Sequence, residues 1–143
     1  MCGICGFWGA YKYSKNLDLG SVATNMSSKL EHRGPDGEGV WVDLNNNLAL
    51  AHRRLSIQDL SQAGAQPMVS SNQQFVISFN GEIYNFIEIR NELTKKGSKF
   101  QGHSDTEVLL EAIQVWGLEK AFASCNGMFE FALWDRRNYS LTL

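Results

Sequence analysis

The second residue of the chain is a cysteine, and its position offers chemistry that an internal cysteine lacks. Once Met1 is removed, Cys2 carries both a thiol and a free α-amine. Reference pKa values are about 8.5 for a thiol and about 7.7–8.0 for an α-amine, so both groups change protonation near neutral pH. The amine can then accept the thiol proton, directly or through a water, and leave a nucleophilic thiolate. Cys5 lacks this option because its nitrogen lies in a peptide bond.

A thiolate that attacks a carbonyl creates a negative oxygen, which needs hydrogen-bond donors placed in advance. Asn80 and Gly81 are candidates for these donors. The asparagine amide donates hydrogen bonds, and a glycine lets its backbone N–H approach a ligand closely. Taken alone, the pair is more typical of a tight turn that ends a strand at Phe79.

Recognition of a free amino acid requires one cation and one anion. Arg54 offers a planar guanidinium for a carboxylate. Asp105, at the start of an expected helix, offers a fixed anion for an ammonium group. Each also has a simpler interpretation: Arg54 as a solvated charge at a strand end, and Asp105 as a first-turn carboxylate that the helix dipole favours.

Redox or zinc chemistry at Cys2 and Cys5 is disfavoured, although the two form a C-x-x-C pair. A structural zinc site needs four ligands, and the sequence has no second C-x-x-C and no H-x-x-x-H. The third cysteine, Cys125, makes the number odd, which argues against a disulfide scaffold. The three histidines lack ligand spacing, so we interpret them as structural and predict no metal site.

The elements that must position these residues follow from hydrophobic periodicity and turn residues. We expect strands at Gly3–Gly9, Val40–Val42, Leu48–Ala51, Gln74–Phe79, Met128–Trp134 and Tyr139–Leu143.

We expect helices over Asp18–Glu31, from Asn85 to Gly97, and from Ser104 onward. The first would bury Val22, Met26 and Leu30. Asn85 would cap the second helix, and Ser104 with Glu107 would form a capping box for the third. Strands cluster instead of alternating with helices, so an α+β fold of antiparallel sheets with packed helices is favoured.

Length and composition indicate one globular domain: 143 residues, 43% hydrophobic, 20% charged and a net charge of −2. No basic stripe indicates nucleic-acid binding, and no apolar run approaches the ~20 residues that span a bilayer. The start of the chain has no charged leader, so we expect a cytoplasmic protein without membrane contact.

Six motifs, in order and spread over almost the whole chain, carry a resemblance to a known family. They are Met1-Cys2-Gly3-Ile4, His32-Arg33-Gly34-Pro35-Asp36, Arg54-Leu55-Ser56-Ile57, Phe79-Asn80-Gly81-Glu82-Ile83-Tyr84-Asn85, Ser104-Asp105-Thr106-Glu107 and Gly127-Met128-Phe129. With them the chain resembles the class II glutamine amidotransferase domain of glutamine-hydrolysing asparagine synthetases.

The resemblance implies an Ntn-hydrolase fold, an αββα sandwich of two antiparallel sheets between helix layers. It implies that Cys2 attacks the side-chain amide of glutamine and that Asn80 and Gly81 form the oxyanion hole. Further substrate-binding roles are implied for Arg54 on the carboxylate, for Asp105 and Glu82 on the ammonium group, and for Leu55 and Ile57 in the pocket lining.

The resemblance also implies partners outside these residues. Ammonia would pass to a C-terminal synthetase domain that uses ATP and Mg²⁺, whereas the glutaminase domain needs no cofactor. Residues 1–143 would form an amidotransferase domain that is incomplete at its C-terminal end, and its unpaired sheet edge would lower stability or favour self-association. A homodimer is a separate expectation. Two alternatives remain open: a catalytically silent binding module of the same fold, and an Ntn hydrolase of another amide.

Overall fold

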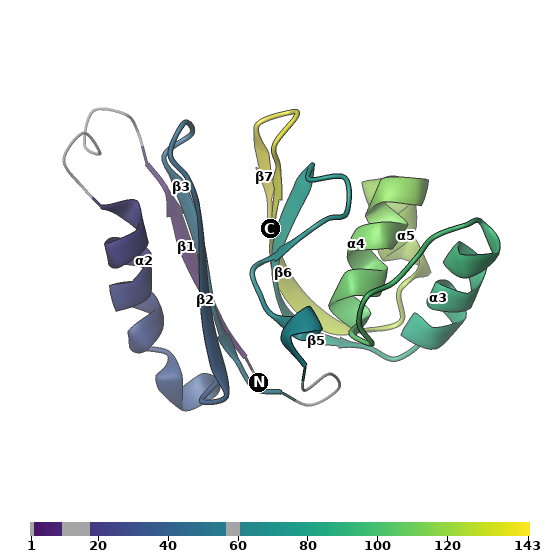
Figure 1. The fold of residues 1–143 in the computed structure, drawn as a ribbon, viewed down its shortest axis with the longest axis horizontal. Helices are drawn as coiled ribbons and strands as arrows, with labels where there is room; N and C mark the ends of the chain where they lie inside the picture. The colour runs from purple at the N-terminus through teal and green to yellow at the C-terminus, as the bar shows by residue number, and fades with distance from the viewer. Residues whose placement is uncertain (1, 10–17, 57–60) are drawn as a thin grey trace.

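Two antiparallel sheets form the centre of the molecule, and helices cover their outer faces (Figure 1). The computed structural model describes residues 2–9, 18–56 and 61–143. The first sheet has the strand order β1-β3-β2, and the second has the order β4-β5-β6-β7. The strands are β1 (Gly3–Trp8), β2 (Gly37–Asp43), β3 (Leu48–Arg54), β4 (Met68–Val69), β5 (Phe75–Ile83), β6 (Gly127–Asp135) and β7 (Ser140–Thr142).

The helices divide between the two outer faces. α2 (Leu19–Ser28) packs on the first sheet, while α3 (Phe86–Lys95), α4 (Asp105–Trp116) and α5 (Leu118–Ser124) lie on the far side of the second sheet (Figure 1). Short 3₁₀ turns occupy Glu31–Arg33 and Gln62–Gly64. The predicted α+β class and the αββα layering are confirmed. No described helix is both long and apolar enough to cross a membrane.

The central strand β3 is buried on both faces, and its side chains alternate between two cores. Ala49 and Ala51 face α2, where small side chains let the helix approach the sheet. Leu48 and Leu50 face the second sheet, where they pack with Trp134 and a valine of β5. Each fully buried large aliphatic side chain contributes about 1.5–3 kcal/mol, so this interface holds the two sheets in a fixed relation.

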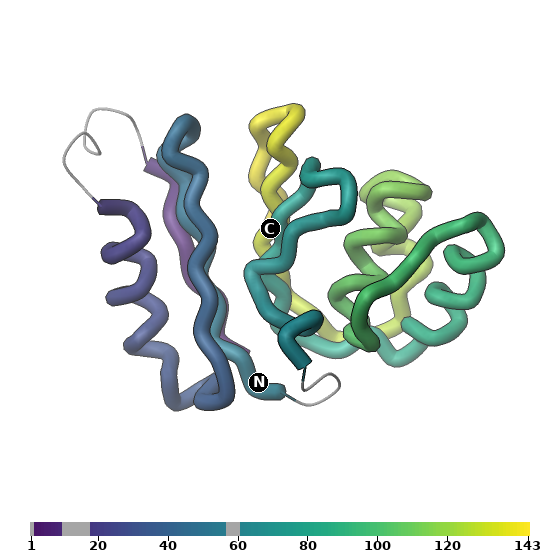
Figure 2. The backbone as a smooth tube through the Cα atoms, viewed as in Figure 1, coloured from purple at the N-terminus to yellow at the C-terminus, as the bar shows by residue number. Residues whose placement is uncertain are grey.

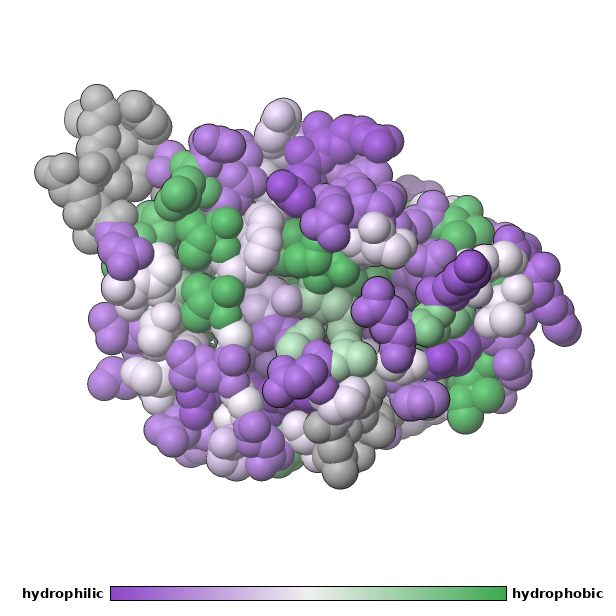
Figure 3. All heavy atoms as spheres, viewed as in Figure 1, coloured by the Kyte–Doolittle hydropathy of each residue, from purple (hydrophilic) through white to green (hydrophobic). Residues whose placement is uncertain are grey.

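The N-terminus of the described chain lies beside the end of β3 (Figure 2). Gly3 pairs with Arg53, so Cys2 continues β1 toward the residues that follow β3. Hydrophobic surface on the face drawn in Figure 3 lies mainly over the two sheets, with hydrophilic surface around it. The candidate nucleophile, Cys2, therefore lies at one end of the sandwich, next to the residues that follow β3.

Two predictions from local pattern are wrong. The Asn80-Gly81 pair does not end a strand, since β5 runs on to Ile83 and pairs with β6 along its whole length. A Cβ at Gly81 would overlap the backbone of β6, so the glycine serves close strand packing and not a turn. In α2 the buried residues are Leu19, Ala23 and Ser27, so the helix faces the sheet with a different stripe from the one expected.

The helix ends also differ in detail. The Asn85 side chain does not cap α3 and instead links the chain to Ser124 O and Asn126 N, which ties α3 to the start of β6. Ser104 caps α4 by accepting from Glu107 N at 3.2 Å. The Glu107 carboxylate accepts from the backbone at residues 101 and 102 rather than from Ser104, so the capping box is only half formed. Helix α5 was not predicted.

Candidate active site

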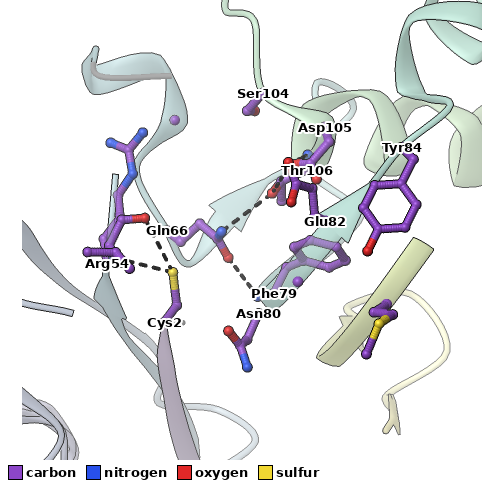
Figure 4. Close-up of a pocket in the computed structure, with 14 residues that line it drawn as sticks. Cys2, Arg54, Gln66, Phe79, Asn80, Glu82, Tyr84, Ser104, Asp105 and Thr106 are labelled. Atoms are coloured by element: carbon purple, nitrogen blue, oxygen red, sulfur yellow. Dashed lines mark hydrogen bonds between the residues drawn. The ribbon is translucent and has the colours of Figure 1, made fainter. Parts of the chain in front are cut away.

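The Cys2 thiol lies against the chain that leaves β3. Its sulfur is 3.3 Å from Leu55 N and 3.7 Å from Leu55 O (Figure 4). The Cys2 carbonyl accepts a hydrogen bond from Arg33 Nε at 3.1 Å. The nucleophile candidate is therefore held on both sides, by a backbone N–H at its sulfur and by a guanidinium at its carbonyl.

The hydrogen-bond phase of the β5–β6 ladder decides which way the backbone at Gly81 points. Tyr84 N donates to Asn126 O at 2.8 Å, so even-numbered residues of β5 bond to β6. In an antiparallel pair these positions alternate with positions whose N–H and C=O face the other way. Gly81 has an odd number, so its N–H points away from β6 and toward the cavity side of the strand.

The neighbouring odd-numbered donors on this edge are already engaged. Phe79 N donates to Gln66 Oε1 at 2.6 Å. Ile83 N donates to Asp105 Oδ2 at 3.0 Å. Between them, Gly81 N–H is the donor that faces the cavity, where a ligand oxygen can accept it. The extended conformation of β5 through Gly81 creates this donor, and a turn at this point would not.

Asn80 lies on the face of β5 that looks toward the first sheet. Side chains alternate along a strand, and Ser78, two residues earlier, donates to Ala51 O of that sheet. Asn80 is only 7% exposed and lines the cavity. Its amide and the Gly81 N–H therefore approach the cavity from adjacent residues, and the Cys2 thiol, just before β1, lines the same cavity.

Asp105 is a buried carboxylate at the first turn of α4. It is 6% exposed and accepts from the backbone N–H of Ile83 and of Thr106. Burial raises the pKa of its carboxyl above the usual value, hydrogen bonds from Ile83 and Thr106 oppose that rise, and the Glu82 charge adds to it. These effects on its pKa include no cation, so a ligand with a positive charge would stabilise the carboxylate.

One cavity of about 270 Å³ joins these groups. This size suits a ligand as small as an amino acid, because pockets for drug-sized ligands begin near 300 Å³. Its lining includes the predicted site residues Cys2, Arg54, Leu55, Asn80, Gly81, Glu82 and Asp105. Ile57, the remaining one, lies outside the described residues. The Arg54 guanidinium donates from Nη1 to Ser61 O at 3.0 Å.

Sequence reasoning missed other residues of the cavity. Gln66 and Thr106 lie at its floor, and Tyr84 and Met128, which are largely exposed, lie at its mouth. Thr106, Tyr84 and Met128 stand inside motifs that were recognised, so closer attention to motif neighbours could have found them. Gln66 stands in a stretch expected to be irregular, and no local pattern marks it.

His52 links β3 to β5, and therefore the first sheet to the second, next to the cavity-lining residue Phe79. Its ring is 1% exposed, and Nε2 lies 3.0 Å from Phe79 O. Burial, with a smaller contribution from nearby Arg54, lowers the pKa of His52 to about 4, although the hydrogen bond to Phe79 O opposes this shift. The neutral ring therefore donates to Phe79 O, in agreement with the predicted structural role. In the described ranges, His, Cys, Asp and Glu form no group of three or more that could hold a metal ion.

Comparison with known proteins adds independent support. The profile of the glutamine amidotransferase domain family matches residues 1–143. Glutamine-hydrolysing asparagine synthetase 1 of Bacillus subtilis (strain 168) is 38% identical over 99% of this chain. Glutamine-hydrolysing asparagine synthetase B of Escherichia coli (strain K12) is 38% identical over 92% of this chain. The chain spans 22% and 23% of these relatives, respectively.

A solved structure extends the comparison to the fold. Glutamine phosphoribosylpyrophosphate amidotransferase from B. subtilis, complexed with ADP and GMP, superposes with a TM-score of 0.74 at 21% identity. The match covers 92% of this chain and 35% of that one. The predicted Ntn-hydrolase fold is thereby confirmed. By the family match over its whole length, the chain belongs to the glutamine amidotransferase domain family.

Proposed function

We propose that this domain hydrolyses the side-chain amide of glutamine, with Cys2 as the nucleophile after removal of Met1. The observation that carries the proposal is that Cys2 and Gly81 line the same cavity, with the Gly81 N–H directed away from β6. A thiolate and an oxyanion donor in one cavity are what attack on an amide carbonyl requires.

In the first half of the reaction, the Cys2 α-amine takes the thiol proton and the thiolate attacks the amide carbon. The carbonyl oxygen becomes negative and accepts hydrogen bonds from Gly81 N–H and the Asn80 amide. The tetrahedral intermediate then collapses, the C–N bond breaks, and the α-ammonium returns its proton to the leaving nitrogen. The products of this half are ammonia and a γ-glutamyl thioester on Cys2.

In the second half, water attacks the thioester while the α-amine accepts a proton from that water. The same two donors hold the oxyanion. The C–S bond breaks, the thiolate recovers a proton from the α-ammonium, and glutamate leaves. The chain returns to its starting state, so no external base is needed.

The opposite end of the substrate carries the charges of a free amino acid. Asp105 would hold the ammonium group. The positive charge of that group would offset the unfavourable burial of the carboxylate, which raises the pKa of Asp105. Glu82 lines the same cavity and would add a second negative charge. Arg54 would hold the carboxylate, while Leu55 and Ile57 would line the pocket.

For the whole protein, we infer a cytoplasmic enzyme whose ammonia passes to a C-terminal synthetase domain. The support is that this chain matches about a fifth of relatives named asparagine synthetases. The synthetase domain would use ATP and Mg²⁺ to activate an acceptor carboxylate, with aspartate as the first acceptor to test. The homodimer and the absence of a cofactor in this domain stay predictions.

Glutamate release by the full-length protein tests the proposal. Mass spectrometry first establishes that the N-terminal residue is Cys2, and the same assay is run on Cys2→Ala as the matched control. We expect glutamate and ammonia in equal amounts from the processed wild type only. Glutamine binding without glutamate release would instead identify a silent binding module, and equal rates on glutamine and N-acylated glutamine would reject recognition of a free amino acid.

A further inference from the structure

The side chain of Gln66 spans the floor of the cavity between the second sheet and α4. Its Oε1 accepts from Phe79 N at 2.6 Å, and its Nε2 lies 3.4 Å from Thr106 Oγ1 (Figure 4). An amide can accept and donate at the same time, which an aliphatic side chain or an ionised carboxylate of this length cannot do. Gln66 therefore connects the strand that carries the oxyanion donors to the helix that carries the ammonium site.

The backbone of Gln66 rests on the first sheet. Gly39 of β2 has no side chain, and a Cβ there would overlap the Gln66 carbonyl. The residue thus contacts β2 through its backbone, and β5 and α4 through its side chain. These are three of the elements that surround the cavity, so a displacement of Gln66 would alter their relative positions.

The order of groups along the edge of β5 gives this contact a functional meaning. Phe79 N–H, Gly81 N–H and Ile83 N–H follow one another on the same edge, each about 6.6 Å from the next at ~3.3 Å per residue. Gln66 occupies the first donor and Asp105 the third. The donor between them is the one proposed to hold the substrate oxygen.

Thr106 closes the connection between these two fixed points. Its hydroxyl donates to Asp105 Oδ1 at 3.4 Å and accepts a hydrogen bond from Gln66 Nε2. A chain of hydrogen bonds therefore runs from Phe79 through Gln66 and Thr106 to Asp105. In the proposed complex the Gly81 donor and the Asp105 carboxylate would lie at opposite ends of the substrate. This chain of hydrogen bonds, together with the direct hydrogen bond from Ile83 N–H to Asp105, holds α4 against β5 and so keeps the two groups apart.

We propose that Gln66 is a positioning residue that, together with the direct hydrogen bond from Ile83 N–H to Asp105, fixes the spacing between the oxyanion donors and the ammonium site, and so selects glutamine over its one-carbon-shorter homologue asparagine. The inference rests on the proposed function and deepens it. A substrate one methylene shorter cannot reach both ends of a cavity whose ends are held apart, whereas a loosened cavity discriminates less.

The test measures kcat and KM for glutamine and for asparagine in the processed full-length protein, with variants Gln66→Met and Gln62→Met. Gln62 is an exposed glutamine four residues earlier, so its variant controls for the loss of an amide in the same segment. We expect the ratio of kcat/KM for glutamine to that for asparagine to fall roughly tenfold or more in Gln66→Met, as the loss of a buried hydrogen bond would give, and to stay at the wild-type value in Gln62→Met.

A second variant keeps the test decisive if Gln66→Met does not fold. Gln66→Glu retains an acceptor for Phe79 N–H but loses the donor to Thr106, so its ratio should fall by less than in Gln66→Met. A wild-type ratio in whichever of the two variants folds would overturn this inference alone. A processed wild type that releases no glutamate would overturn the proposed function, and the present inference with it.

Discussion

Acidification should destabilise residues 1–143 through His52 by an amount that follows from the burial of its ring. The side chain is 1% exposed, Nε2 donates to Phe79 O, and the structure gives Nδ1 no partner among the described residues. A proton on this ring would place a charge between the two sheets. Burial accordingly lowers the pKa of His52 from 6.5 to about 4.

The sign of the effect follows from where each state takes up the proton. Below pH 6.5 the unfolded chain binds a proton at His52, whereas the folded chain does not do so until about pH 4. The free energy of unfolding therefore falls as the pH drops through this window, and it levels off below it. At 1.36 kcal/mol per pKa unit, the loss between neutral pH and about pH 4 is about 3 kcal/mol.

Urea unfolding of the wild type and of His52→Gln, at about pH 7 and about pH 4, measures this loss. Glutamine can still donate to Phe79 O but does not titrate. Tryptophan fluorescence follows the unfolding, and Trp134, fully buried between the sheets, contributes to it. Subtracting the pH dependence of His52→Gln from that of the wild type removes the contribution of the other titrating groups. One of these is Asp105, whose raised pKa acts in the opposite direction and stabilises the folded chain as the pH falls. The same pH dependence in both proteins would refute the reasoning.

Three further predictions concern the proposed site. Cys2→Ala should lower glutamate release about a thousandfold or more, with unchanged circular dichroism; residual activity near that of wild type would reject the nucleophile. Arg54→Ala should raise KM for glutamine about tenfold with little change in kcat, since a hydrogen bond to a charged group is worth ~1.5–3 kcal/mol; an unchanged KM would reject its role. Gly81→Ala should destabilise the domain by about 1–3 kcal/mol in urea unfolding, because the added Cβ overlaps β6; wild-type stability would contradict this packing.

The sequence predicted which residues meet in the cavity better than it predicted the local structure around them. Cys2, Gly81 and Asp105 were grouped correctly because each belongs to a motif whose chemistry is visible in residue types. The predicted turn at Gly81 was wrong because it rested on the backbone freedom of glycine, which is a local property. The actual reason is the approach of Phe129 on β6, which is 48 positions away in the chain and invisible to any local pattern.

The other misses have the same physical origin. The buried stripe of α2 depends on how the helix sits over Ala49 and Ala51, and the helix sequence alone has apolar residues on more than one face. Gln66 joins β2 to β5 because its carbonyl packs against Gly39, which has no side chain, and because its side chain accepts a hydrogen bond from Phe79 N–H. Residues that act by joining distant elements carry no signature of their own, while residues that perform chemistry do.

The division of the site between two sheets explains why such joining residues matter. The Cys2 thiol directly precedes β1 of the first sheet, whereas the Gly81 donor belongs to the second sheet, so no single strand or helix fixes the distance between nucleophile and oxyanion. That distance depends on the apolar interface around Trp134 and on the hydrogen bond from His52 to Phe79 O, which crosses from β3 to β5 two residues before Gly81. Catalytic geometry in this fold is therefore a property of sheet packing, and a neutral histidine in that interface is part of the packing rather than of the chemistry.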